Sequence, residues 1–99
     1  MTEEDPEPPN RNASDCQQVF SVGWVRGLHL RPVKQIVQIA KSFQSKITLI
    51  KDGKEANGKS PMSILMLESP AHTEILVRAS GEDAEAAVLA VGAIIEARK

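Results

Sequence analysis

The chain has 99 residues, of which 41% are hydrophobic and 25% charged, the balance of one small globular domain. Five acids and one arginine give residues 1–15 a net charge of −4, whereas eleven basic and eight acidic side chains give residues 16–99 a net charge of +3. This excess suits an anionic ligand or an acidic partner, and it is too small to indicate nucleic-acid binding.

The single cysteine, Cys16, cannot form an internal disulfide and leaves no second thiol for a metal site, so we expect neither a metal nor a cofactor. The start, M-T-E-E-D-P-E-P-P, is acidic and proline-rich, the reverse of a signal peptide. No apolar run approaches the roughly 18 residues that a membrane span needs. A cytoplasmic protein without membrane contacts is expected.

Residues 1–16 are predicted to form a disordered, acidic tail, because prolines and acids dominate them and large aliphatic side chains are missing after the first residue. One folded domain is predicted over residues 17–99. It opens with Q-Q-V-F-S-V-G, in which Phe20 and Val22 fall on one face, as in a half-buried strand.

A helix and a hairpin are predicted next along the chain. The helix begins at Pro32, because the apolar residues that follow repeat with helical spacing. Branched side chains predict a strand over residues 46–51. Asp52 and Gly53 then supply a two-residue turn into a third strand over residues 54–57.

Ser60 followed by Pro61 is typical of the first turn of a short helix, and residues 73–79 are predicted to form a fourth strand. Ser80 and Asp83 then resemble a capping box at the start of a long amphipathic helix. That helix is predicted to end on two cations that suit the negative end of its dipole, Arg98 and Lys99. The order βαββαβα predicts a two-layer α/β (α+β) sandwich with helices on one face of an antiparallel sheet.

The stretch G-L-H-L-R-P, residues 27–32, joins the first strand to the first helix. Gly27 allows a tight turn and Pro32 suits a first helical turn, which places His29 beside backbone N–H groups that no earlier carbonyl satisfies. These donors form an anion site and favour the neutral, nucleophilic imidazole. Arg31 offers paired hydrogen bonds to phosphate oxygens. The pattern predicts that His29 carries a phosphoryl group reversibly.

Other interpretations of these residues stay open. A lone histidine near a helix start is more often a surface residue or a cap, and His72, in E-S-P-A-H-T, is assigned no role. A simple anion-binding module would hold phosphate without a covalent bond. Hydrolysis by Cys16 and His29 is the least favoured alternative, because Cys16 borders the predicted tail and no orienting acid is evident.

The motifs G-L-H-L-R-P, I-T-L, D-G-K, N-G-K-S-P-M and S-G-E-D-A, in this order and spacing, resemble HPr over residues 17–98. HPr is the histidine-containing phosphocarrier family of the bacterial phosphoenolpyruvate-dependent sugar phosphotransferase system. The resemblance implies a four-stranded sheet in the order 1-4-2-3 under three helices, phosphorylation of His29 at Nδ1, and pairing of Arg31 with the phosphate. Phosphate would arrive from enzyme I and leave to enzyme II components, so the chain would act in a relay and not as a stand-alone enzyme.

The resemblance also implies a regulatory site and a docking surface on a monomer. Ser60 matches the serine that an ATP-dependent HPr kinase phosphorylates in some members, although serine before proline is also an ordinary helix start. Partners are expected to dock on apolar side chains around the two helix starts, Leu28, Leu30, Met62 and Leu65. Leu65 suits core packing at least equally well.

Three departures from the family pattern bear on the choice of partner. Leu30 stands where alanine or threonine is usual, Trp24 and Arg26 stand where smaller or neutral residues are common, and Pro61 replaces an aliphatic residue. None of them removes a reacting group. The main alternative is a regulatory HPr-like protein, either nitrogen-related or switched at Ser60, that acts by binding target proteins.

Overall fold

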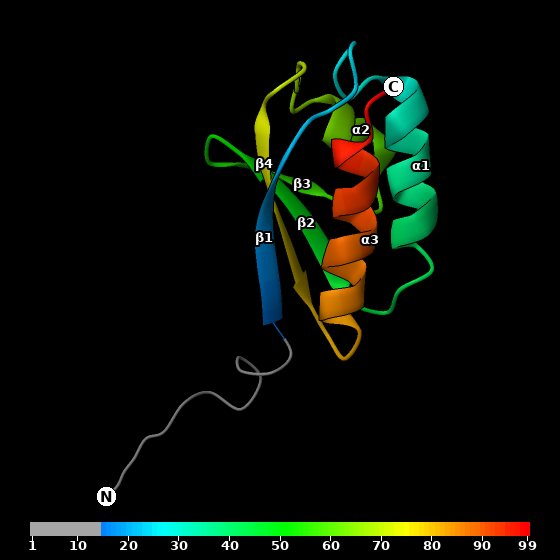
Figure 1. Ribbon diagram of the computed structural model, residues 1–99. Helices are drawn as coiled ribbons and strands as arrows, with labels where there is room; N and C mark the ends of the chain where they lie inside the picture. Colours follow the sequence, from blue (N-terminus) through cyan, green and yellow to red (C-terminus); the bar gives the residue numbers. More distant parts are fainter. Residues whose placement is uncertain (1–14) are drawn as a thin grey trace, which may run out of the picture.

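The structure, a computed structural model, describes residues 15–99, so most of the predicted tail lies outside the described residues. Its first strand begins at Asp15, which places Asp15 and Cys16 in the sheet and not in the predicted tail. Seven elements follow one another along the chain (Figure 1): β1 (Asp15–Ser21), α1 (Leu30–Ala40), β2 (Lys46–Lys51), β3 (Lys54–Asn57), α2 (Pro61–Leu65), β4 (Glu74–Ser80) and α3 (Ala84–Glu96).

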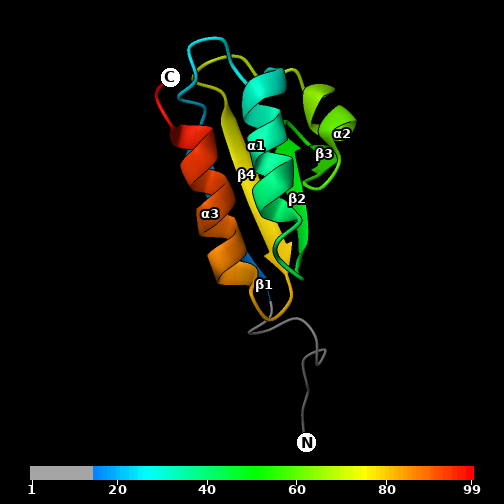
Figure 2. The ribbon, with the colours of Figure 1, turned by 90° about the vertical axis from the view of Figure 1, so that its right-hand side faces the viewer.

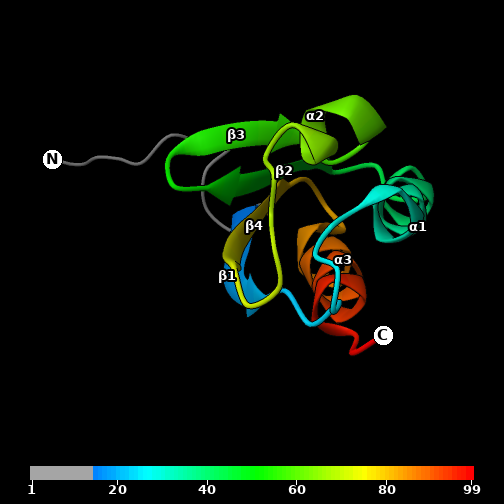
Figure 3. The same cartoon turned by 90° about the horizontal axis from the view of Figure 1, so that it is seen from above.

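The four strands form one antiparallel sheet in the order β1-β4-β2-β3, which confirms the predicted fold class and strand order. Figure 2 shows α1 and α3 side by side against one face of the sheet, and Figure 3 shows the same two layers from above. The short helix α2 packs against α1 and β3. Because the last strand, β4, lies between β1 and β2, the core is built from residues far apart in sequence.

The core lies between the sheet and the helices. Alternate residues of the strands point into it, as the period-two pattern predicts for a sheet with one covered face. From the helix side, α1 buries the stripe that its spacing predicts, and α3 buries alanine and branched aliphatic side chains. The largest fully buried apolar side chains are Val22, Val33, Ile36, Ile47, Leu49, Ile64, Ile75, Val77, Val88, Val91 and Ile95.

The predicted hairpin turn between β2 and β3 is confirmed. Asp52 has a φ of 50° and Gly53 a φ of 80°, the backbone of a type I′ turn, which matches the twist of two antiparallel strands. The turn pairs Lys51 with Lys54 and brings Ala56 opposite Leu49 on the covered face.

The predicted capping box at the start of α3 is wrong. Asp83 is itself the N-cap residue, and its carboxylate makes no hydrogen bond to the first turn. Its oxygens instead accept hydrogen bonds from the backbone N–H groups of Gln44 and Ser45, both at 2.9 Å, and from the Ser45 hydroxyl. The carboxylate therefore ties α3 to the turn between α1 and β2, a partner that no local sequence pattern reveals.

The last helix is also shorter than predicted. It ends at Glu96, so the cations at positions 98 and 99 lie beyond its last turn. Two carbonyls at this end accept hydrogen bonds from the β1–α1 loop: Ile94 from Trp24 Nε1 at 2.6 Å, and Ile95 from the Gly23 N–H at 2.9 Å. Donors from another segment thus cap the helix in place of its own side chains.

We predict that Asp83 makes stability depend on pH in the acid range. Its hydrogen bonds, that of the Ser45 hydroxyl first, hold the pKa of the Asp83 carboxyl below the ordinary value of 3.8. The folded state then binds fewer protons than the unfolded state, so the stabilisation is complete above the ordinary pKa and is lost as pH falls through the lowered one. Asp83→Asn should lower the urea concentration at the midpoint of unfolding at neutral pH. As the pH is lowered, this midpoint should fall less steeply in the variant than in wild type.

The matched control is Glu82→Gln, because Glu82 is exposed and makes no side-chain hydrogen bond within residues 15–99. Denaturation curves measured at several pH values separate the two variants. Parallel pH profiles for wild type and Asp83→Asn would contradict the assignment.

Candidate functional site

Backbone hydrogen bonds fix the part of the β1–α1 loop that leads directly to α1. The Gly27 N–H donates to Trp24 O at 2.9 Å, the Leu28 N–H to Ser69 O at 2.8 Å, and the His29 N–H to Gly27 O at 3.0 Å. Gly27 has a φ of 74°, and a Cβ there would collide with the backbone of Ser69. The loop thus crosses directly against the turn before β4, and only glycine fits at the crossing.

His29 is the N-cap residue of α1, as the sequence predicts. Its backbone is extended, with a φ of −89° and a ψ of −167°, and its Nδ1 accepts a hydrogen bond from the Arg31 N–H at 3.4 Å. Pro32 supplies no N–H, so Leu30 and Arg31 provide the donors of the first turn. The Nδ1 lone pair therefore points at the positive end of the helix dipole.

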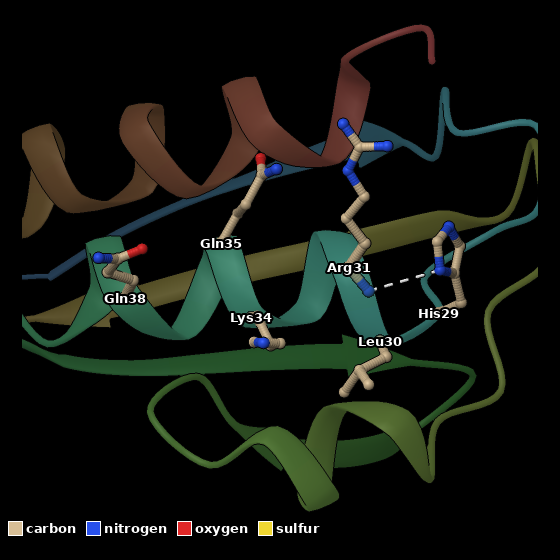
Figure 4. A pocket seen from close by; sticks show the side chains of 6 residues that line it. All are labelled: His29, Leu30, Arg31, Lys34, Gln35 and Gln38. Atoms are coloured by element: carbon tan, nitrogen blue, oxygen red, sulfur yellow. Dashed lines mark hydrogen bonds between the residues drawn. The ribbon is translucent and has the colours of Figure 1, made fainter.

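Arg31 lies next to the ring through its backbone, while its guanidinium extends to one side (Figure 4). The side chain is exposed and makes no hydrogen bond within residues 15–99. Its charge is therefore available to an anion at His29 without breaking an existing ion pair of the described chain.

Two shallow depressions flank His29, and both are cationic. One, of about 330 Å³, is lined by His29 together with Trp24, Val25, Arg26, Arg31 and Lys99. The other, of about 470 Å³, is lined by His29, Leu30, Arg31, Lys34, Gln35 and Gln38. No aspartate or glutamate side chain of residues 15–99 lines either one, so an anion on His29 meets several positively charged side chains.

Sequence reasoning missed two of these cations. Lys34 follows Arg31 by three residues, so the helical repeat alone puts both on one face and could have revealed it. Lys99 comes from the end of the described chain, where its main-chain oxygen accepts a hydrogen bond from the Val25 N–H at 3.0 Å. No local pattern connects it with a site 70 residues earlier in the sequence.

The predicted docking residues separate into two groups. Leu30 and Met62 are 56% and 65% exposed at the starts of α1 and α2, and Met66, the C-cap residue of α2, is 70% exposed. Leu28 is only 5% exposed, because the Leu28–Ser69 backbone bond turns its side chain into the core. Leu28 is therefore a core residue and no part of a docking surface, and Leu65 is partly buried against the core.

Ser60 is the N-cap of α2, as the sequence predicts, and its Oγ accepts a hydrogen bond from the Ser63 N–H at 3.4 Å. His72 lies in the turn before β4, lines a different depression with Glu96 and Arg98, and does not meet His29. Cys16 pairs with Ala79 at the far end of the sheet, which excludes a Cys16–His29 pair.

The described part of the chain, residues 15–99, contains no group of three or more histidine, cysteine or acidic side chains placed to hold a metal ion. Among these residues there is also no helix of the length and apolar character that crossing a bilayer requires.

Fold and site together define an open-faced α+β domain that presents a capping imidazole at a cationic helix tip. A family model described as the PTS HPr component phosphorylation site matches residues 16–97, and the chain belongs to this HPr family. It is 40% identical to the phosphocarrier protein HPr of Borreliella burgdorferi over 76% of this chain and 87% of that protein. It is 38% identical to the HPr-like protein Crh of Bacillus subtilis over 81% of this chain and 94% of that protein.

A solved structure supports the same conclusion. The crystal structure of phosphocarrier protein HPr from Bacillus anthracis aligns with a TM-score of 0.80 at 37% sequence identity. The alignment covers 85% of this chain and 99% of that one. The elements that carry the site here therefore have counterparts in a known HPr.

We predict that neutral His29 carries its ring proton on Nε2. The Nδ1 lone pair accepts the Arg31 N–H, so the other nitrogen must hold the proton. Nitrogen-15 correlation spectra of the imidazole rings, recorded where they are neutral, should show one dominant tautomer for His29. His72 gives the internal comparison in the same spectrum, and a proton found mainly on Nδ1 of His29 would contradict the capping geometry.

Proposed function

We propose that this chain is a phosphocarrier of the phosphoenolpyruvate-dependent phosphotransferase system that carries the phosphoryl group on Nδ1 of His29. It accepts the group from phosphorylated enzyme I and passes it to enzyme II components. Membership of the HPr family supports the carrier function. The observation that carries the choice of atom is the N-cap geometry of His29, whose Nδ1 lone pair faces the first turn of α1.

In the transfer, the Nδ1 lone pair attacks phosphorus and forms the N–P bond. The bond between phosphorus and the donor atom of enzyme I breaks, and its electron pair stays on the donor. The new phosphoryl oxygens take over the Arg31 N–H that Nδ1 accepted before, and the adjacent Leu30 N–H is a second donor. The helix end thus stabilises the neutral ring and the anionic product with the same groups, as reversible transfer requires.

The cations around the tip act on the phosphoryl group and on the approach of partners. Arg31 is placed to pair with the phosphoryl oxygens, while Arg26, Lys34 and Lys99 raise the positive potential around His29. An acidic surface on a partner would match this charge. We expect this steering to weaken with salt, because these side chains are exposed or border open depressions.

Beside the cations, the exposed apolar side chains of Leu30, Met62 and Met66 are proposed to seat the partner. Exposed large apolar side chains on two helices that pack together, here α1 and α2, are typical of a docking site. Leu30 lines one of the depressions with His29 and points toward α2, so its bulk is proposed to discriminate between partners. We propose a monomer, because one chain supplies every group of this surface. We also propose a cytoplasmic location, as the sequence predicts.

Incubation with phosphoenolpyruvate and catalytic amounts of enzyme I should place one acid-labile, base-stable phosphate on the wild-type protein. His29→Ala should abolish it, because the accepting nitrogen is gone. Arg31→Ala should slow it by about tenfold or more, since hydrogen bonds to charged groups contribute roughly 1.5–3 kcal/mol. Phosphate is followed by intact-protein mass spectrometry before and after acid treatment.

The matched control is His72→Ala, which removes the chain's other histidine from a turn that does not meet His29. It should be phosphorylated like the wild type. If the wild type is not phosphorylated by enzyme I from several bacteria, the carrier proposal is wrong. That result would favour the regulatory alternative, for which the similarity to the HPr-like protein Crh is the supporting observation.

We also propose that Ser60 is a regulatory phosphorylation site for an HPr kinase. Its hydroxyl is half-buried as the cap of α2, next to the exposed Met62. A dianion there would be tolerated by the helix end and would disturb apolar docking more than folding. An acid-stable phosphate formed with ATP and such a kinase should vanish in Ser60→Ala and persist in Ser63→Ala, and its persistence in Ser60→Ala would end the proposal.

A further inference from the structure

Trp24 is the chain's only tryptophan, and it packs against the reacting histidine. The two ring centroids lie 6.0 Å apart with an interplanar angle of 83°, an edge-to-face arrangement. Trp24 is 2% exposed, whereas the His29 ring is half-buried at the surface. A rigid aromatic ring thus forms one wall beside an imidazole that must present a single nitrogen.

The indole is itself fixed at several points. Its Nε1–H donates to Ile94 O at the end of α3, at 2.6 Å. The Lys99 ammonium lies 6.0 Å from the ring centroid, over its face. The Trp24 carbonyl accepts from the Gly27 N–H, which closes the turn leading to His29. Trp24 therefore connects the reacting residue to α3, an element that supplies none of the groups placed to contact the phosphoryl group.

The imidazole needs such a support, because its own capping bond is weak. At 3.4 Å, the bond from the Arg31 N–H to Nδ1 is longer than typical N–H donor–acceptor distances of about 2.7–3.2 Å. Rotation about the bond to the ring is intrinsically soft and roughly two-fold, so a half-turn exchanges Nδ1 for a carbon. Phosphorylation also occupies the Nδ1 lone pair, whereas an aromatic contact does not depend on it.

We propose that Trp24 is a positioning residue for phosphoryl transfer, which holds the His29 ring with Nδ1 toward the tip of α1. The inference rests on the proposed phosphorylation of His29. Trp24 acts through His29 and touches no transferred atom.

The test compares Trp24→Leu, Trp24→Phe and Phe43→Leu with wild type in two measurements. The first is the rate of phosphorylation by phosphorylated enzyme I, and the second is the tautomer of His29 in nitrogen-15 spectra. Trp24→Leu should slow transfer about three- to tenfold, the effect of losing one aromatic pair, and should mix the His29 tautomers. Trp24→Phe keeps a ring but loses the Nε1–H, so its effects should be smaller.

Phe43→Leu is the control for the loss of a packed aromatic ring. Phe43 is partly buried against the core beyond the far end of α1, about 16 Å along the helix from His29. It should change neither the rate nor the tautomer. Circular dichroism verifies folding, and if Trp24→Leu does not fold, Trp24→Phe must show both effects in reduced form.

A folded Trp24→Leu protein with the wild-type rate and a single His29 tautomer would overturn the inference. Its failure is distinguishable from failure of the proposed function. If wild type is not phosphorylated, the carrier proposal fails, and the tautomer spectra of the variants still decide whether Trp24 orients the ring. His72 again provides the internal reference, because it lies outside the contact with Trp24.

Discussion

The site depends on one local interaction, the capping of the first turn of α1 by the imidazole of His29. Serine or aspartate is the usual residue at such a cap. An ordinary cap residue would satisfy the backbone donors of this turn permanently. His29 satisfies one of them through Nδ1 in a long, exposed bond, which leaves the helix end able to exchange that acceptor for another. Reversible binding of an anion follows from this weak cap, since a strong one would have to be broken at a cost each time.

The rest of the fold holds this tip in place. The loop before it is bonded to the turn ahead of β4 through Leu28 and to the last turn of α3 through Gly23 and Trp24. At the other end of the helices, the Asp83 carboxylate bonds the start of α3 to the turn after α1. Both ends of the helical layer are thus fixed by contacts between distant segments. A tip held in this way needs little reorganisation when charge arrives, which favours rapid transfer.

Charge and apolar surface are separated around the site in a manner that suits a carrier with successive partners. Cations from the loop, from α1 and from the segment after α3 surround the ring, while Leu30, Met62 and Met66 lie toward α2. In the proposed function, the cations hold the phosphoryl group and attract acidic surfaces, and the apolar side chains add contact area with no net charge. Ser60 caps α2, the helix that carries Met62, so a charge placed there would fall on the proposed docking surface and not at the cap of α1.

Much of this protein is determined locally by its sequence. Strand alternation, the Asp52-Gly53 turn, the Ser60 cap and the position of His29 all follow from side chains within a few residues of one another, and the structure confirms them. What only the tertiary structure decided are the contacts across long stretches of chain. These are the partners of the Asp83 carboxylate, the early end of α3, the burial of Leu28, and the approach of Trp24 and the last residues to the ring. The physical reason is that a capping donor or a buried side chain is selected by whatever the fold brings within a few ångströms, and periodicity carries no information about that neighbour.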